Sequence, residues 1–250
     1  MEAQAYPSHF VGLSLPDAGE GESTVLVIVN RACSGRLCPS GRAGGLARRS
    51  RDWVGCRGSG RAPTGGESLQ VIESAQLEAA RQRACEYFEL AGIVITAEER
   101  ANIEEADFGL GELGTTGLEL VVYVNTRRVC AKELVLFPRQ TCPEHRHPPI
   151  GDSPGKEETF RVRMGTVYLN VEGEPTSSPG AKPPSGRKAA YSVFHEIVLG
   201  PGEQYTIWPN TLHWFQSGDD GAVVSEFSTE SVDEADVFTD PDIQRVTVVG

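Results

Sequence analysis

The spacing of apolar residues divides the chain into a helical part and a strand-rich part. Between residues 77 and 91, apolar side chains recur at intervals of three and four, the period of an amphipathic helix: Leu77, Ala80, Ala84, Tyr87, Phe88 and Ala91. Gly92 stands where a helix C-terminal cap is expected. Thr96 and Glu99 match a capping box, so a second, short helix is predicted to begin there.

From residue 118 onward, β-branched and apolar residues come in short runs separated by turn signals. The runs predict strands over residues 118–125, 129–137, 158–163, 166–171, 191–199, 205–208, 212–216 and 222–227. A Pro-rich loop is expected at 174–186, and the acidic tail, 230–242, is expected to pack as irregular chain across one end. Turn signals at this spacing favour an antiparallel sandwich or barrel, so the fold class is mainly β with two N-terminal helices.

Residues 1–66 have a different composition from the rest of the chain. Between Arg31 and Arg61 there are eight arginines and one acidic residue, and only residues 24–29 have strand character. Such a segment buries too little apolar surface to offset the entropy of ordering it. We expect residues 1–68 to be a disordered basic extension or, preferably, a mistranslated leader whose true start lies near Val71. Residues 69–250 then form the functional domain.

The formal net charge is −12, which argues against nucleic acid or an anionic membrane surface as a partner. No apolar run approaches the roughly 20 residues that span a bilayer. Six cysteines in 250 residues do not suggest a disulfide scaffold, and Cys33, Cys38 and Cys56 lack the spacing and the histidines of a zinc site. These features predict a soluble, cytoplasmic protein.

The candidate chemistry lies between Thr141 and Gly165. His145 and His147 are two residues apart, so in an extended strand both imidazoles point to the same face. Glu158 follows after a loop rich in Pro and Gly, which can bring a second strand alongside the first. Two imidazoles and a carboxylate on one face predict a site for a first-row divalent metal.

These residues also resemble a known motif. His145, His147, Glu158 and Gly165 are similar to the first motif of the cupin superfamily, although the gap before Glu158 is longer than is common there. The second cupin motif is matched approximately by Gly202, Pro209 and His213. Several blocks resemble the D-lyxose isomerases more closely: 104–111, 122–126, 141–149, 155–160, 209–215 and 238–241. The resemblance covers about residues 72 to 248.

The resemblance implies a cupin-type β-barrel, or jelly roll, with His213 as a fourth metal ligand beside His145, His147 and Glu158. It implies a metal-dependent isomerase that interconverts D-lyxose and D-xylulose, and also D-mannose and D-fructose. It further implies manganese and a homodimer. The ligand types alone suit Mn, Fe, Co, Ni or Zn equally.

An aldose–ketose isomerase needs an acid/base group over C1 and C2 of the sugar. Glu226 is the candidate because it occupies a strand position where a buried strand would otherwise have an apolar residue. The alternative is an outward-facing strand acid. Lys156 could bind a sugar hydroxyl or a developing oxyanion, and the alternative is a solvated loop lysine. For His195 two alternatives remain: a residue that contacts the metal ligands from outside, or an ordinary surface residue.

Two other functions remain open on the same fold. Three histidines and one glutamate also serve non-haem iron dioxygenases, which would have an apolar pocket. A non-catalytic sugar-binding cupin would use the pocket without needing Glu226. Trp214, Phe215 and Tyr168 could form an apolar wall behind a sugar or belong to the core, and Asp240 and Arg245 are expected to pair and fix the tail.

Overall fold

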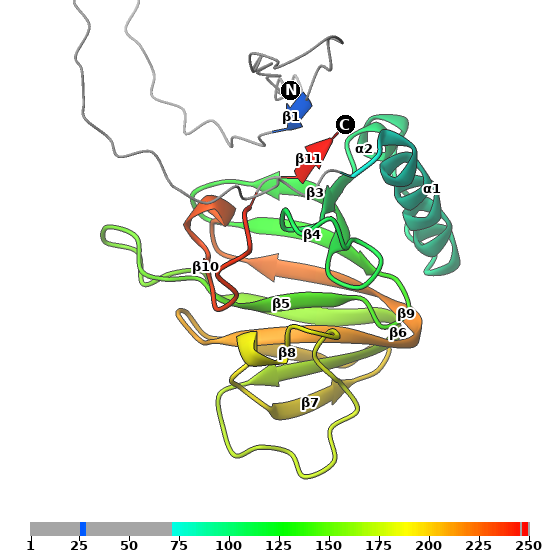
Figure 1. The fold of residues 1–250 in the computed structure, drawn as a ribbon. Helices are drawn as coiled ribbons and strands as arrows, with labels where there is room; N and C mark the ends of the chain where they lie inside the picture. Colours follow the sequence, from blue (N-terminus) through cyan, green and yellow to red (C-terminus); the bar gives the residue numbers. More distant parts are fainter. Residues whose placement is uncertain (1–25, 29–71, 246, 250) are drawn as a thin grey trace, which may run out of the picture. The chain divides into compact units, whose positions relative to one another are not determined.

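The computed structural model describes residues 26–28, 72–245 and 247–249 (Figure 1). Two helices, α1 (Ser74–Leu90) and α2 (Ala97–Ala101), precede the strands of the main sheet, as predicted. The strands of the main sheet are β2 (Glu104–Ala106), β3 (Leu118–Asn125), β4 (Cys130–Leu136), β5 (Thr141–Arg146), β6 (Glu158–Val171), β7 (His195–Leu199), β8 (Gln204–Ile207), β9 (His213–Ser228) and β10 (Val237–Phe238). The fold is the expected mainly β, cupin-type architecture, a curled antiparallel sheet.

Strand β9 is the centre of the sheet, because it pairs with β4, β5 and β6 along different parts of its length. The strand order on one path is β10-β5-β9-β4-β3-β2, while β6 adds β7 and β8 on its other side. Every one of these pairings is antiparallel. The ends of β5, β6 and β9 are thereby brought together, although they are far apart in sequence.

Two strand predictions were wrong in the same way. The predicted strands 158–163 and 166–171 belong to one long strand, β6, and the predicted strands 212–216 and 222–227 belong, from His213 onward, to one long strand, β9. The register between them shifts near Gly165, whose φ of 75° lies in the left-handed region. A Cβ at Gly165 would meet the backbone oxygen of Gly221 at 2.0 Å, so the close approach of the two strands requires glycine.

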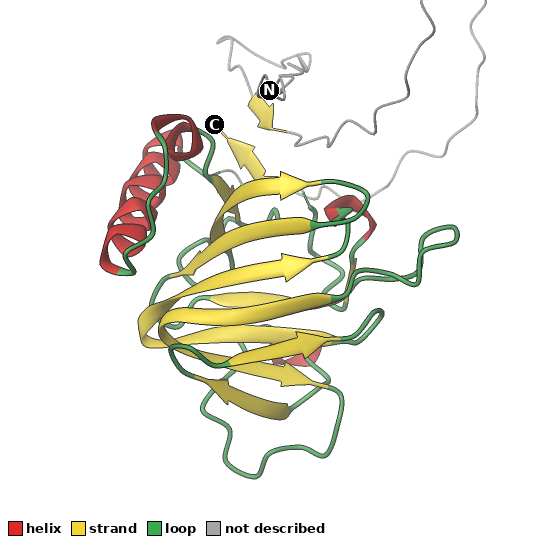
Figure 2. Cartoon of the chain, turned by 180° about the vertical axis from the view of Figure 1, so that it is seen from behind, coloured by secondary structure: helices red, strands yellow, loops and turns green. Residues whose placement is uncertain are grey.

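The inner face of the curled sheet holds the largest apolar cluster. Its buried members include Leu118, Leu134, Phe160, Val162, Leu169 and Phe215. On the outer face, α1 packs Leu77, Ala84 and Phe88 against Val121, Val135, Phe137 and Val223. Figure 2 shows this helix lying beside one end of the sheet. The helical period read from the sequence therefore marks the face of α1 that is buried.

The helix ends follow the predicted signals. Gly92 follows α1 with a φ of 70°, and its amide donates to the carbonyl of Glu89. Thr96 caps α2: its hydroxyl accepts from the amide of Glu99, and the carboxylate of Glu99 accepts from the amide of Thr96. The capping box is therefore confirmed.

The segment before β7 departs from the prediction. Residues 191–194 are not part of a strand, and a short 3₁₀ helix, Lys188–Ala190, precedes them. This segment instead packs on the sheet through Tyr191, whose ring lies edge-on to Trp214 at 4.9 Å. The tail is also more ordered than expected, since Val237–Phe238 pairs with β5.

Two other stretches complete the described chain. β1 (Leu26–Ile28) pairs antiparallel with β11 (Thr247–Val249), in agreement with the strand character of residues 24–29. The remaining part of the predicted extension, with Cys33, Cys38 and Cys56, lies outside the described residues, and the boundary at residue 68 stays a prediction. None of the helices that the structure describes is long and apolar enough to cross a membrane.

Candidate metal centre and its pocket

Four predicted ligands meet at the ends of three strands. His145 lies near the end of β5 and His147 just beyond it, while Glu158 begins β6 and His213 begins β9. His145 is the direct cross-strand partner of His213. All four side chains are buried, and one ligand atom from each lies within 4.8 Å of the others. The structure therefore brings together the set that the sequence predicted.

Each imidazole is held through its Nδ1 atom by an oxygen. Nδ1 lies 2.8 Å from the Pro143 carbonyl in His145 and 2.9 Å from the Thr211 carbonyl in His213. In His147, Nδ1 lies 2.5 Å from Oδ1 of Asp236. A carbonyl can only accept, so Nδ1 carries the proton in His145 and His213, and the lone pair of Nε2 is left for a cation. Such outer contacts are typical of histidines that bind metals.

The space between the Nε2 atoms favours positive charge. Oε1 of Glu158 lies 3.0 Å from Nε2 of His213 and 3.2 Å from Nε2 of His147. Nε2 of His213 is buried and has no hydrogen-bond partner among the described residues. A nitrogen lone pair that faces a carboxylate oxygen without a proton between them is unfavourable, and a divalent cation bound by both groups removes that conflict. The donor set therefore fits a metal.

The pKa values in this group agree with that fit. Burial and the two neighbouring imidazoles hold the pKa of His145 well below its usual range, so this ring is neutral and able to ligate. In His147, burial acts against the charged form. The Glu158 carboxylate and the hydrogen bond with Asp236 nevertheless raise its pKa to about 9. The pocket thus stabilises a positive charge beside Glu158.

Lys156 connects the candidate metal centre to Glu226. Its Nζ atom lies 2.6 Å from Oε2 of Glu158 and 2.6 Å from Oε1 of Glu226. Burial works against the charge of Lys156, but the two carboxylates raise its pKa well above the usual range, so it remains an ammonium group. Lys156 is buried and lines the pocket, so it is not the solvated loop lysine of the alternative reading. Glu226 is also buried and lines the pocket, so it is not an outward-facing strand acid.

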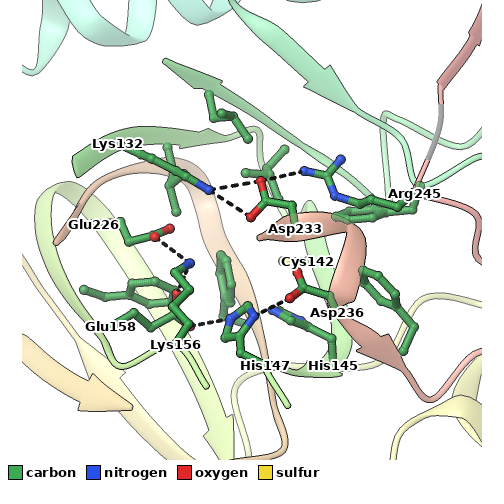
Figure 3. A pocket seen from close by; sticks show the side chains of 17 residues that line it. Lys132, Cys142, His145, His147, Lys156, Glu158, Glu226, Asp233, Asp236 and Arg245 are labelled. Atoms are coloured by element: carbon green, nitrogen blue, oxygen red, sulfur yellow. Dashed lines mark hydrogen bonds and ion pairs between the residues drawn. The ribbon is translucent and has the colours of Figure 1, made fainter. Parts of the chain in front are cut away.

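The pocket beside the metal ligands encloses about 450 Å³, including its open mouth. Figure 3 shows four charged side chains in its wall that the sequence did not mark as site residues: Lys132, Asp233, Asp236 and Arg245. For Lys132 a signal existed, because its position in β4 has the same parity as the inward Leu134 and Leu136. The two aspartates lie in an acidic tail where no pattern distinguishes them.

Several other candidates lie elsewhere. His195 is exposed, and its ring contacts the carbonyl of Glu174. Trp214 is fully buried in a separate cluster with Tyr191, while Phe215 does line the pocket. Tyr168 packs beside the cluster of Trp214 and does not line the pocket.

The expected pairing of Asp240 with Arg245 was wrong. Asp240 pairs with Arg187 at 2.9 Å. Arg245 instead reaches Glu104 at 2.9 Å and Asp233 at 3.4 Å. The tail folds back over the sheet, so Asp240 and Arg245 each form ion pairs with residues that are near in space but distant in sequence, Arg187 and Glu104.

Glu144 fixes that tail beside the predicted ligands through hydrogen bonds on the side away from them. Its carboxylate accepts from the amides of Ser192 and Val193, and from the hydroxyl of Thr239 at 2.7 Å. The Glu144 carbonyl also accepts from the amide of Thr239. Phe238 is thereby held against the ring of His145, at a centroid distance of 5.5 Å.

The fold is shared with solved sugar isomerases. The structure of Cellulomonas parahominis L-ribose isomerase with L-ribose has a TM-score of 0.61 and 16% identity, and the match covers 73% of this chain and all of that one. The L-ribose isomerase of Acinetobacter sp. DL28 in complex with L-ribose gives the same values. No family model matches the sequence. Fold and site together define a cupin-type protein with a candidate metal centre.

Sequence comparison is more specific. The chain is 60% identical over 176 residues to the D-lyxose/D-mannose isomerase of Thermosediminibacter oceani, which covers 70% of this chain and 97% of that protein. It is 63% identical over 167 residues to the D-lyxose ketol-isomerase of a Thermofilum species, covering 67% of this chain and 93% of that protein. The chain belongs to the D-lyxose isomerase family, which confirms the resemblance read from its motifs.

Proposed function

We propose that this protein is a metal-dependent aldose–ketose isomerase that interconverts D-lyxose and D-xylulose, and D-mannose and D-fructose. The observation that carries the proposal is the position of Glu226 and Lys156 beside three histidines and a glutamate in one buried pocket. The names of the family members, D-lyxose ketol-isomerase and D-lyxose/D-mannose isomerase, support the choice of substrates.

Glu226 is the proposed acid/base group. The reaction needs a carboxylate that removes the proton from C2 of the open-chain aldose and returns it to C1, while the hydroxyl proton passes from O2 to O1. The sugar gains and loses no atoms overall, and an enediol lies between the two forms. Glu226 is buried and faces the cavity, so its carboxylate can reach a bound substrate without competition from bulk water.

Lys156 has a second proposed role in the same step. Its ammonium group already donates to Glu226, and it can turn one N–H toward the sugar oxygen on which negative charge develops. A fixed ammonium in a buried site stabilises that charge more strongly than water does. Lys156 also orients Glu226 by holding one of its oxygens.

His145, His147, Glu158 and His213 would hold the metal, which when bound polarises the sugar oxygens as a Lewis acid. We propose Mn²⁺ as the native ion, supported by the resemblance of the motifs. The ligand types also accept Fe, Co, Ni and Zn. Elemental analysis of protein purified without added metal identifies the ion, and a site filled by another of these metals would overturn the choice of manganese.

The charge of the pocket favours a sugar over the substrate of a dioxygenase. Lysine, arginine and carboxylate side chains line the cavity beside its aromatic residues. Such groups form hydrogen bonds with hydroxyls and would remain unpaired against an apolar substrate, which is costly. Oxygen consumption with any of the sugars would instead support the dioxygenase.

The direct test is isomerisation of D-lyxose by the purified protein. We expect D-xylulose to form, activity to disappear after chelation, and Mn²⁺ to restore it. In D₂O, proton transfer through an enediol places deuterium on the product, whereas a hydride shift does not. Failure of the metal-loaded protein to convert D-lyxose or D-mannose would overturn the proposal, and sugar binding without turnover would point to the non-catalytic cupin.

We also propose that the protein forms a homodimer, as the motifs imply. Three exposed apolar side chains belong to adjoining parts of the sheet: Tyr123 lies in β3, Val129 directly before β4 and Phe227 in β9, and these strands pair in the order β3-β4-β9. A partner surface could cover them. Light scattering at micromolar concentration tests this, and a monomeric mass would contradict it.

A further inference from the structure

The two carboxylate oxygens of Glu226 have different surroundings. Oε1 lies 2.6 Å from Nζ of Lys156 and accepts a hydrogen bond of 3.2 Å from the hydroxyl of Ser228. Among the described residues, no hydrogen bond or ion pair reaches Oε2. Because Glu226 lines the pocket, Oε2 is the oxygen left to face a substrate, while Oε1 is the oxygen that the protein holds.

Ser228 reaches Oε1 because of its place on β9. Residues two apart on a strand point to the same face, so Ser228 and Glu226 both face the interior of the curled sheet. Ser228 pairs with Glu158 on one neighbouring strand and with Cys130 on the other. Its hydroxyl therefore lies in the same row of the sheet as a predicted metal ligand, and next to the row that carries Glu226.

The hydroxyl of Ser228 has two acceptors within reach. Its Oγ atom lies 2.9 Å from the carbonyl oxygen of Thr229, in addition to the 3.2 Å to Oε1 of Glu226. A hydroxyl has one proton to donate, so the two acceptors compete for it. A hydrogen bond to an ionised group is roughly twice as strong as one between neutral groups. The hydroxyl therefore turns to Glu226 while that side chain is charged, and to Thr229 once Glu226 carries a proton.

This second acceptor matters for the proposed proton transfer. The proton moves from C2 of the sugar to Oε2 of Glu226 and then from Oε2 to C1, while the proton of Ser228 stays on Oγ and only changes direction. A hydrogen bond from Ser228 favours the charged form of Glu226 and by itself opposes uptake of the proton. Because the Thr229 carbonyl accepts when Glu226 is neutral, Ser228 orients the carboxylate without being left unpaired later in the reaction.

Two donors on Oε1 restrict Glu226 more than one does. Figure 3 shows the Lys156 ammonium between Glu158 and Glu226, so Lys156 is shared between two carboxylates. Hydrogen bonds to a carboxylate oxygen lie close to the plane of the carboxylate, so a second donor from a different element fixes that plane. A misplacement of about 1 Å at a reacting group can cost about a hundredfold in rate.

We propose that Ser228 is a positioning residue for the acid/base group. Its hydroxyl holds Oε1 of Glu226 and, together with Lys156, fixes the plane of the carboxylate so that Oε2 faces C1 and C2 of the sugar. This inference rests on the proposed isomerase function. Ser228 is not part of the pocket lining, so it acts through Glu226 and not by touching the sugar.

The test compares Ser228→Ala, which removes the hydroxyl, with Ser228→Thr, which keeps it. We expect Ser228→Ala to lower kcat for D-lyxose about tenfold to a hundredfold, as for a lost hydrogen bond to a charged group, with KM changed by less than about twofold. Ser228→Thr should restore most of kcat. Metal content, measured by elemental analysis, should equal that of wild type in both variants, because the four predicted ligands are untouched.

The exposed Ser177→Ala is the matched control and should leave both kinetic constants unchanged. If Ser228→Ala folds poorly, Ser228→Cys takes its place, since a thiol is similar in shape and a weak donor. A kcat within about threefold of wild type in the variant without the hydroxyl, or a loss that lies mainly in KM, would overturn the inference. So would a Ser228→Thr enzyme that is as slow as Ser228→Ala.

The inference and the function on which it rests fail in different ways. Wild-type protein that converts D-lyxose, with Ser228→Ala equally fast, keeps the isomerase and removes the role of Ser228. If no sugar is converted, a double-mutant cycle of Ser228→Ala and Glu226→Gln in urea unfolding tests the contact itself. Coupled effects on the free energy of unfolding support the hold of Ser228 on Glu226 even where the isomerase proposal has failed, and additive effects contradict it.

Discussion

The Nζ atom of Lys156 lies 2.6 Å from Oε1 of Glu226, and both side chains are buried. The same ammonium group lies 2.6 Å from Glu158, so one cation joins the candidate metal centre to the candidate acid/base. Glu226 itself is not one of the four predicted ligands. We therefore expect a substitution at Glu226 to lower turnover more than it lowers metal affinity.

We expect Glu226→Gln to reduce kcat by about 10²–10⁴-fold, because an amide cannot carry the proton between C2 and C1. The change is nearly isosteric and does not touch the four predicted ligands, so the metal content measured by elemental analysis should be unchanged. Steady-state kinetics on D-lyxose provides the first readout.

The matched control for this prediction is Glu172→Gln, an exposed glutamate that follows β6. It should leave kcat and metal content at wild-type values. A Glu226→Gln enzyme that retains more than a tenth of the wild-type kcat would assign the proton transfer to another group.

The contact between Asp236 and His147 predicts a change in metal affinity. Asp236 holds Nδ1 of His147 and so orients Nε2 toward the other ligands. Removal of such an outer partner typically weakens metal binding 10–100-fold. We expect Asp236→Ala to raise the Kd for Mn²⁺ by that factor, as measured by competition with a chromophoric chelator.

Asp242→Ala provides the comparison, since Asp242 is an exposed acid of the same tail whose carboxylate lies 3.5 Å from Arg187 and whose backbone amide, which the substitution keeps, donates to Asp240. Its Mn²⁺ affinity should match that of wild type. Equal affinities in the two variants would show that His147 keeps its orientation without Asp236.

The buried Glu105 predicts a pH dependence of stability that does not involve the candidate metal centre. Burial raises its pKa to about 7, although Arg81 lies 2.9 Å away and works in the opposite direction. The folded state therefore binds this proton more tightly than the unfolded chain does. The free energy of unfolding should fall as the pH rises from about 4.5 to about 7, by on the order of 2–3 kcal/mol from this group.

Glu105→Gln should remove that part of the pH dependence and make the protein relatively more stable at pH 8. Urea unfolding from pH 4.5 to 8, compared between variant and wild type in the presence of a chelator, isolates the contribution, because other titrating groups are common to both. The exposed Glu86→Gln on α1 serves as control. Parallel curves for wild type and Glu105→Gln would contradict the shift.

Much of the architecture follows from local sequence. The helical period of residues 77–91, the capping box at Thr96 and the strand at 118–125 appear where they were predicted. Two of the four predicted ligands were recognisable for a similar reason: His145 and His147 lie two residues apart in one short segment. These patterns depend only on residues within one helical turn or one strand, so they can be recognised without knowing which distant residues pack against them.

The continuity of β6 and β9 could not be read in the same way. Glycines at 165, 218 and 221 signal turns when the chain is considered alone. In the folded sheet, β6 pairs with Ala222 through Gly165 and with Ser217 through Val167, and the shift in register between these two pairs absorbs residues 218–221. A tertiary contact thus overrides a local preference.

By itself, the sequence determined which residues have the chemistry of a metal site, which family they resemble, and which face of α1 is buried. Only the tertiary structure decided that Lys156 bridges two carboxylates, that Asp236 holds His147, and that Lys132, Asp233 and Arg245 lie together in the pocket wall. The physical reason is that the energy of a charged side chain depends on its distance to other charges, and those distances are set by the tertiary fold. The tail that supplies Asp233, Asp236 and Arg245 has no periodic pattern, and its position is fixed by pairing with β5 and by the hydrogen bonds of Glu144.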